Sequence, residues 1–142
     1  MPKIRLEQAE KIIDAALKHG AEIKCAPLSV AVLDDGGHLV AFRRQDNSGI
    51  LRFEIAVGKA YGALGMGWSS RALAAVAEQR PQFVQSLMAA SHGRLIPVAG
   101  GVLIRGGDGT LIGAVGISGD TSERDEACAI AGVEATGLVA DV

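Results

Sequence analysis

The chain has 142 residues, 49% hydrophobic and 21% charged, so it can bury a core and is predicted to form one domain over residues 1–142. A formal net charge of −2 without any Lys/Arg run argues against a nucleic-acid partner. Charges interrupt the apolar positions of the opening stretch MPKIRLEQAEKII, so we expect no signal peptide, no membrane partner and a cytoplasmic location.

The first predicted element is an amphipathic helix. Apolar residues recur at three- and four-residue steps from Leu6 to Leu17, with charged residues between them. Gly20 follows at a place where a left-handed helix cap favours glycine, so the helix is predicted to end near residue 19 or 20. His19 lies at this end, where a cation interacts favourably with the helix dipole.

Two β-hairpins are predicted by similar turn chemistry. In PLSVAVLDDGGHLVAFRRQ, apolar and β-branched runs flank the turn residues 34–37. Late in the chain, GGVLIR and TLIGAVGIS flank the glycine-rich turn at residues 106–109. Each pair of runs is therefore expected to form antiparallel strands.

Helices are predicted between the two hairpins. Residues 51–66 carry apolar side chains at helical spacing, together with glycines that let a neighbouring element come close. Residues 69–79 begin with a serine suited to an N-cap, and Pro81 can open the next segment. The stretch HGRLIPVAGG, residues 92–101, is predicted to be a loop or a short edge strand.

The last predicted helix runs to about Ala135. Thr121 or Ser122 precedes acidic residues that favour the positive end of a helix. The order helix, hairpin, helices, hairpin, helix predicts an α+β fold, with helices packed on an antiparallel sheet.

The stretch LIGAVGISGDTSERDEACA, residues 111–129, suggests a phosphate-binding loop at first sight. It contains no lysine, which a P-loop needs, and its first two glycines lie inside an apolar strand pattern instead of a strand-to-helix turn. Glycine in a strand more often makes room for a ligand or a neighbouring backbone. Helix capping explains the acids that follow, and the alternative is a surface cation site formed by Asp120, Glu123, Asp125 and Glu126.

Several basic residues are candidates for ligand binding. Lys59 lies among small apolar residues, so it needs an anionic partner, which could be a carboxylate of a ligand or of another subunit. Arg44 and Asp46 follow a strand and either bind an anionic ligand or are solvated. His92 lies in a loop shortly before a glycine pair and is a candidate acid or base, although a solvated or structural role is the alternative.

Cys25 and Cys128 lie far apart without CxxC spacing, so neither a disulfide framework nor a zinc site is expected, and each is predicted to be a buried thiol. Nineteen glycines and only 4% aromatic residues indicate closely packed faces. Such faces often pack against copies of the same chain, so an oligomer is expected.

Three segments carry a family resemblance: GKAYGA (58–63), PVAGGVLIR (97–105) and GTLIGAVGISGDTSERDEACAIAGVEA (109–135). With the first helix and hairpin in the same order, they resemble the GlcG/HbpS-like family of haem-binding proteins, which is related to the C-terminal domain of PduO-type adenosyltransferases. The resemblance implies a profilin-like or PAS-like antiparallel sheet of about five strands flanked by helices. It also implies haem as the cofactor and self-association, from dimer to octamer.

The resemblance also implies a set of binding residues. The positions that match the family pattern and are candidates for the cofactor site are Arg44, Asp46, Lys59, Gly100, Gly101, Gly113 and Ser118. No histidine falls within a matched stretch, so His19 and His92 are the candidate axial ligands of the haem. Many members have proline where Leu103 stands, so the lip of the pocket is expected to differ.

The leading hypothesis is a small oligomeric haem-binding protein, active in haem handling or sensing. One alternative is an enzyme or accessory protein that acts on a small carboxylic acid, with the basic groups binding the carboxylate and His92 as acid or base. The other is a structural oligomer without catalysis. The residues leave open whether the protein is an enzyme.

Overall fold

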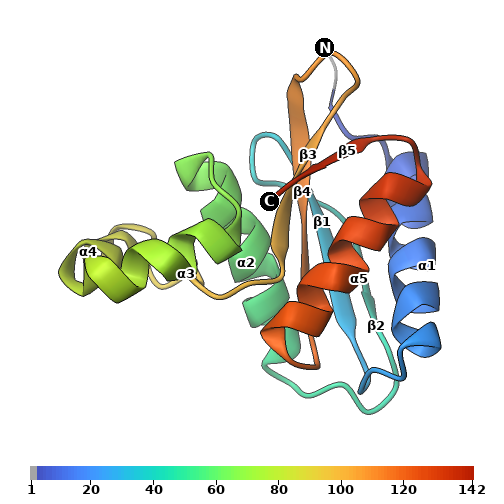
Figure 1. The fold of residues 1–142 in the computed structure, drawn as a ribbon, viewed down its shortest axis with the longest axis horizontal. Helices are drawn as coiled ribbons and strands as arrows, with labels where there is room; N and C mark the ends of the chain where they lie inside the picture. The colour runs from blue at the N-terminus through green and yellow to red at the C-terminus, as the bar shows by residue number, and fades with distance from the viewer. Residues whose placement is uncertain (1–2) are drawn as a thin grey trace.

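The computed structural model describes residues 3–142, which form a five-stranded antiparallel sheet with helices on both faces (Figure 1). The helices are α1 (Leu6–Glu22), α2 (Arg52–Met66), α3 (Ser70–Gln79), α4 (Pro81–Ala90) and α5 (Ser122–Ala135). The strands are β1 (Ser29–Asp34), β2 (Leu39–Arg44), β3 (Gly101–Arg105), β4 (Leu111–Ser118) and β5 (Val139–Asp141). The strand order is β2-β1-β4-β3-β5. The predicted α+β class and the five strands are confirmed.

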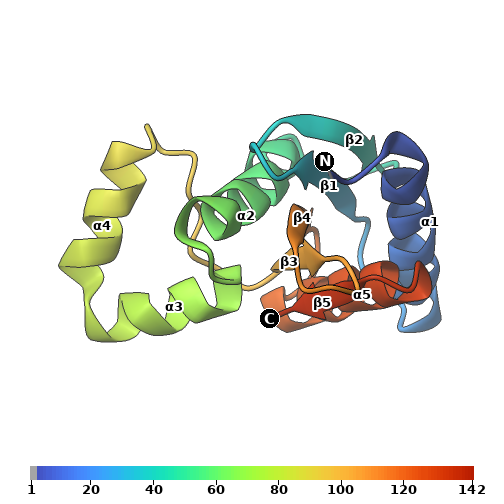
Figure 2. The ribbon, with the colours of Figure 1, turned by 90° about the horizontal axis from the view of Figure 1, so that it is seen from above.

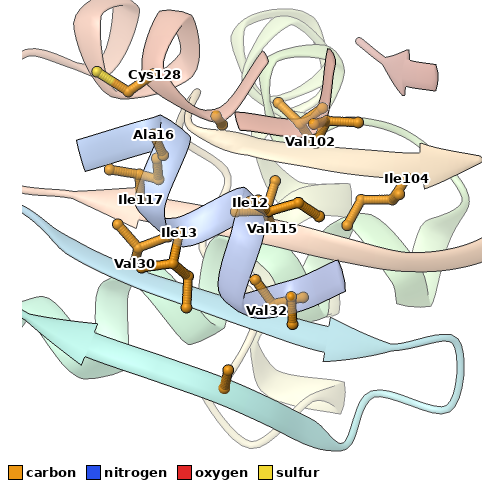
Figure 3. Packing of buried hydrophobic residues seen from close by; sticks show 14 of the residues in the cluster. Ile12, Ile13, Ala16, Val30, Val32, Val102, Ile104, Val115, Ile117 and Cys128 are labelled. Atoms are coloured by element: carbon orange, nitrogen blue, oxygen red, sulfur yellow. The ribbon is translucent and has the colours of Figure 1, made fainter. Parts of the chain in front are cut away.

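The two faces of the sheet are covered differently. Helices α1 and α5 lie side by side on one face, whereas α2 lies on the other (Figures 1 and 2). Alternate strand residues supply the two cores, as the two-residue period of a strand requires. The larger core lies under α1 and α5 (Figure 3) and includes the fully buried Ile12, Ile13, Val30, Val32, Val102, Ile104, Val115 and Ile117.

On the second face, α2 rests directly on the backbone of two strands. Gly101 of β3 and Gly116 of β4 are register partners. A Cβ on Gly116 would overlap the carbonyl oxygen of Ala56, and one on Gly101 would overlap the carbonyl oxygen of Lys59. The glycines of the strand pattern therefore make room for a neighbouring backbone, which is one of the two roles predicted for them.

The opposite side of α2 also lies close to another segment. A Cβ on Gly62 would be 2.7 Å from Cγ of Leu95, and one on Gly58 would overlap Ile96. The segment before β3 therefore crosses the outer side of α2. This packing explains Gly58 and Gly62 but not Gly65, whose Cβ would have no atom within 4 Å.

Helices α3 and α4 extend away from the sheet as an arm (Figures 1 and 2). Ser69 caps α3 by accepting a hydrogen bond from the N–H of Ala72, and Pro81 is the first residue of α4, both as predicted. Among the helices in residues 3–142, none has the length and apolar character needed to cross a membrane.

Most predicted boundaries agree with the structure. The turns at residues 34–37 and 106–109 join paired strands, residues 92–100 form a loop, and Thr121 caps α5, which ends at Ala135. The prediction for the end of α1 was wrong. Gly20 lies inside the helix, where it makes room for Leu28, since a Cβ there would be 2.8 Å from Cδ1 of Leu28. The left-handed residue is Lys24, with φ of 59°.

We expect Gly116→Ala to lower the free energy of unfolding by about 3 kcal/mol or more, since the new methyl group would meet backbone atoms of α2, which cannot rotate away. The matched control is Gly107→Ala, whose Cβ would have no atom within 4 Å and which should change the stability by less than about 0.5 kcal/mol. Urea unfolding measures both values. Equal midpoints for the two variants would contradict the packing described.

Candidate functional site

Lys59 reaches from α2 into the interior between the helix and the sheet. It is 2% exposed, and its Nζ donates hydrogen bonds to the carbonyl oxygen of Ile117 (2.8 Å) and to Oδ2 of Asp125 (3.2 Å). Burial lowers the pKa of Lys59 and raises the pKa of Asp125, while each charge partly offsets this effect on the other. The predicted anionic partner of Lys59 is therefore present, but it is a carboxylate of the same chain and not of a ligand or another subunit.

The other candidates near Lys59 also lie in the interior. A Cβ on Gly100 would be 2.7 Å from Nζ of Lys59. Gly113 lies away from Lys59 near the start of β4, where a Cβ would overlap the carbonyl oxygen of Leu33. The hydroxyl of Ser118 is buried and accepts a hydrogen bond from Nη1 of Arg52 at 2.9 Å. With Gly101 under α2, the structure brings Lys59, Gly100, Gly101 and Ser118 together as a closely packed region between the helix and the sheet.

The acids considered as a cation site are engaged by the protein. Glu126 accepts hydrogen bonds from the guanidinium of Arg71, the shortest at 2.7 Å, and Oδ1 of Asp125 accepts from the N–H of Asp120 at 2.9 Å. Backbone hydrogen bonds lower the pKa of Asp120. Within residues 3–142, no group of three His, Cys, Asp or Glu residues could hold a metal ion. The alternative reading of these acids as a cation site, which included the exposed Glu123, is therefore not supported within the described residues.

Two of the remaining candidates border a cavity of about 580 Å³ beside the end of α1. We call it the Cys25 pocket, and its lining residues are Gly20, Ala21, Cys25, Pro27, Arg44, Gln45 and Asp46. His19 lies on α1 but is not among these residues, and its Nδ1 is 3.7 Å from the carboxylate of Glu22. Arg44 and Asp46 therefore border a different pocket from His92 and are not among the contacts of Lys59.

His92 borders a second cavity, of about 320 Å³, on the outer side of α2. We call it the His92 pocket, and its lining residues are Phe53, Glu54, Val57, Gly58, His92, Gly93 and Arg94. His92 has a left-handed backbone (φ 58°) and its N–H donates to the carbonyl oxygen of Ala89, so it forms the turn that ends α4. A non-glycine residue in this conformation costs about 1 kcal/mol or more, which makes the turn a strained position.

Arg94 is held beside this pocket by an aromatic ring. Its guanidinium lies 4.1 Å from the ring centroid of Tyr61 and donates a hydrogen bond to the Tyr61 hydroxyl at 2.6 Å. Among the ion pairs in the described part of the chain, none involves Arg94, so its charge is available to an anion. The pocket can therefore offer an imidazole, a cation and an apolar wall to one ligand.

The apolar wall of the His92 pocket was missed in the sequence. Helical spacing includes Phe53 and Val57 among the apolar positions of this helix, but it does not show that they border a cavity. In the structure, Ala56 and Ala60 face the sheet. Phe53 is 37% exposed, and its ring packs edge-on against Phe42 of β2, with the ring centroids 4.8 Å apart. The available signal was the pair Gly58 and Gly62, which marks a second closely packed side of the same helix.

These features define a class of small α+β proteins in which a helix lies on an antiparallel sheet. The outer side of that helix borders an apolar pocket that also contains basic and imidazole groups. The chain belongs to the HbpS-like family, described as haem degrading protein HbpS-like, whose pattern it matches over residues 4–134. A relative from Citrobacter freundii, an uncharacterized 15.0 kDa protein in the dhaT-dhaS intergenic region, is 30% identical over 122 residues, covering 86% of this chain and 84% of the relative.

Solved structures show the same fold. HbpS is 26% identical, with a TM-score of 0.81 over 95% of this chain and 91% of HbpS. ORFY from Klebsiella pneumoniae is 25% identical, with a TM-score of 0.87 over 96% of this chain and 92% of that one. PduOC, solved in complex with haem, is 23% identical with a TM-score of 0.87 over 99% of both chains, a likeness that concerns the fold.

Breaking the buried ion pair should be costly on either side. We expect Lys59→Met and Asp125→Asn each to lower the free energy of unfolding by about 3–5 kcal/mol, because each leaves one buried charge without its partner. The double variant should lose less than the sum of the two, by about 1 kcal/mol or more. Urea unfolding of the cycle measures this coupling, with Lys11→Met on the surface of α1 as the control. Strictly additive losses would show that the two charges do not interact.

Proposed function

We propose that the protein is a small haem-binding homo-oligomer that handles or senses haem in the cytoplasm, and that haem binds at the His92 pocket. The observation that carries this proposal is that the imidazole of His92 and the unpaired guanidinium of Arg94 share one apolar pocket. The family description and the haem complex of PduOC support haem as the ligand.

The residues of the His92 pocket fit the parts of a haem group. The His92 imidazole is a suitable axial ligand, and the Arg94 guanidinium suits a propionate. Phe53 and Val57 offer apolar surface to the macrocycle. Tyr61 fixes the direction of Arg94, so the cation is in place before a ligand arrives. Bound haem would supply iron redox chemistry at this site, and the chain would supply binding, orientation and exclusion of water.

The size of the pocket favours a second copy as part of the site. A volume of about 320 Å³ is near the lower end of ligand pockets, roughly 300–1,000 Å³, so one chain encloses only part of a macrocycle. Helix α4 lies just before His92 in the chain. It has no charged residue, and of its side chains only Val84 is buried. Packing of a second copy against α4 would cover its apolar surface, including the exposed Met88, and complete the open side of the pocket.

A haemin titration followed by the Soret band tests the site. We expect His92→Asn to weaken haemin binding about tenfold or more, equivalent to about 1.4 kcal/mol, because the axial nitrogen is lost. Asparagine tolerates the left-handed backbone of this turn, so the fold should be retained. His19→Asn is the matched control and should bind like the parent. Loss of binding only in His19→Asn, or equal binding by all three proteins, would contradict the assignment.

Light scattering after gel filtration tests the assembly. The parent chain should elute with a mass between two and eight times that of one chain, and Met88→Glu should shift it toward the monomer by placing a charge on the apolar side of the arm. Lys18→Glu, an exposed charge change on α1, should leave the mass unchanged. A parent that is monomeric at tens of micromolar would overturn the proposed assembly.

A further inference from the structure

The two cysteines, 103 positions apart in the chain, meet in the folded protein. Cys25 lies in the connection between α1 and β1, Cys128 lies in α5, and their Sγ atoms are 3.9 Å apart. Figure 3 shows Cys128 at the edge of the larger core, close to Ala16 of α1. Gly20 lies beside both cysteines, because a Cβ there would be in van der Waals contact with Sγ of Cys128 (3.6 Å) and Cβ of Cys25 (3.7 Å).

The two thiols have different surroundings. Cys25 is partly exposed and borders the Cys25 pocket, whereas Cys128 is fully buried behind it. Burial, together with the neighbouring Cys25, raises the pKa of Cys128 to about 12, so this thiol stays protonated at neutral pH. The thiolate is the reactive form of cysteine. A reactant in the Cys25 pocket can contact Cys25 but not the buried Cys128. Cys25 is therefore placed to react first with a molecule in the pocket. Cys128 is placed to react next with the mixed disulfide formed on Cys25.

The rest of the pocket shows which reactant fits. Its volume is about 580 Å³, enough for a small organic molecule, and Arg44 and Asp46 place a cation and an anion on its wall. A molecule with both carboxylates and ammonium groups would find a complementary charge for each. Glutathione disulfide is a small disulfide with this chemistry.

We propose that Cys25 and Cys128 form a thiol–disulfide exchange pair that is oxidised by a small zwitterionic disulfide bound in the Cys25 pocket. In the first step, the Cys25 thiolate attacks one sulfur of the disulfide, whose sulfur–sulfur bond breaks and releases one small thiol, which takes up a proton. In the second, the sulfur of Cys128 attacks Sγ of Cys25 and the bond between Cys25 and the small molecule's sulfur breaks. The proton of Cys128 passes to the departing sulfur, which leaves as the second small thiol. Two electrons pass from the protein dithiol to the small disulfide, and a Cys25–Cys128 disulfide remains.

The geometry requires only a local movement for the second step. A disulfide has its sulfur atoms about 2.0 Å apart, compared with 3.9 Å in the reduced protein. The connection that carries Cys25 is short and partly exposed, so it is the part that moves toward the buried Cys128. The pair shares no residue with the His92 pocket, so its chemistry can be tested independently of haem.

The experiment uses the reduced full-length protein, glutathione disulfide as the probe and intact mass analysis after an acid quench. The parent should lose two hydrogens and keep no glutathione, and peptide mapping should find Cys25 linked to Cys128. Cys128→Ser should accumulate one glutathione on Cys25, since nothing resolves the mixed disulfide. Cys25→Ser should remain unmodified because Cys128 is buried.

A second comparison tests the pocket itself. In the Cys128→Ser background, Arg44→Gln should slow formation of the glutathione adduct several-fold, and it should not slow the reaction with cystamine, a disulfide without carboxylates. A parent that keeps a stable glutathione adduct, or a Cys128→Ser variant that forms none, would overturn the exchange pair. Equal rates with and without Arg44 would overturn the proposed choice of a carboxylate-bearing disulfide. The peptide map of the oxidised parent needs no variant, so the central result does not depend on how the variants fold.

Discussion

The contact between the backbone of α2 and the glycine pair Gly101 and Gly116 is the constraint on which the rest of the structure depends. At these two positions it lets the backbone of the helix lie directly on β3 and β4. At this depth Lys59 enters the interior and meets Asp125 of α5. The outer side of the helix remains free to pack against the segment around Leu95 and to form one wall of the His92 pocket.

The buried ion pair explains why this arrangement is specific. Burial disfavours the charged forms of both Lys59 and Asp125, so the pair contributes little net stability compared with an apolar contact. Any arrangement that separates the two groups leaves a buried charge without a partner and is strongly penalised. The main effect of the pair is therefore to disfavour structures in which α2 is displaced from the sheet and from α5. Helix α2 in turn positions the pocket that we propose for haem.

Much of the fold could be predicted from local patterns, whereas the site could be predicted only in part. Turn chemistry identified both hairpins, and spacing and caps identified the helices. Gly20 was misread because a glycine near a helix end is typical of a cap, and only tertiary packing shows that it contacts Leu28. The need of Lys59 for an anion was predicted, but no local pattern connects it to a carboxylate 66 residues away. The same limit applies to Cys25 and Cys128, whose proximity arises from the packing of α1 against α5.

Amide hydrogen exchange with and without haemin tests most directly whether the outer side of α2 is the binding site. If haem binds at the His92 pocket, peptides covering residues 52–58 and 91–96 will exchange more slowly in its presence, and those covering residues 20–27 and 44–46 will not change. Protection around the Cys25 pocket, with none at residues 91–96, would contradict the central claim.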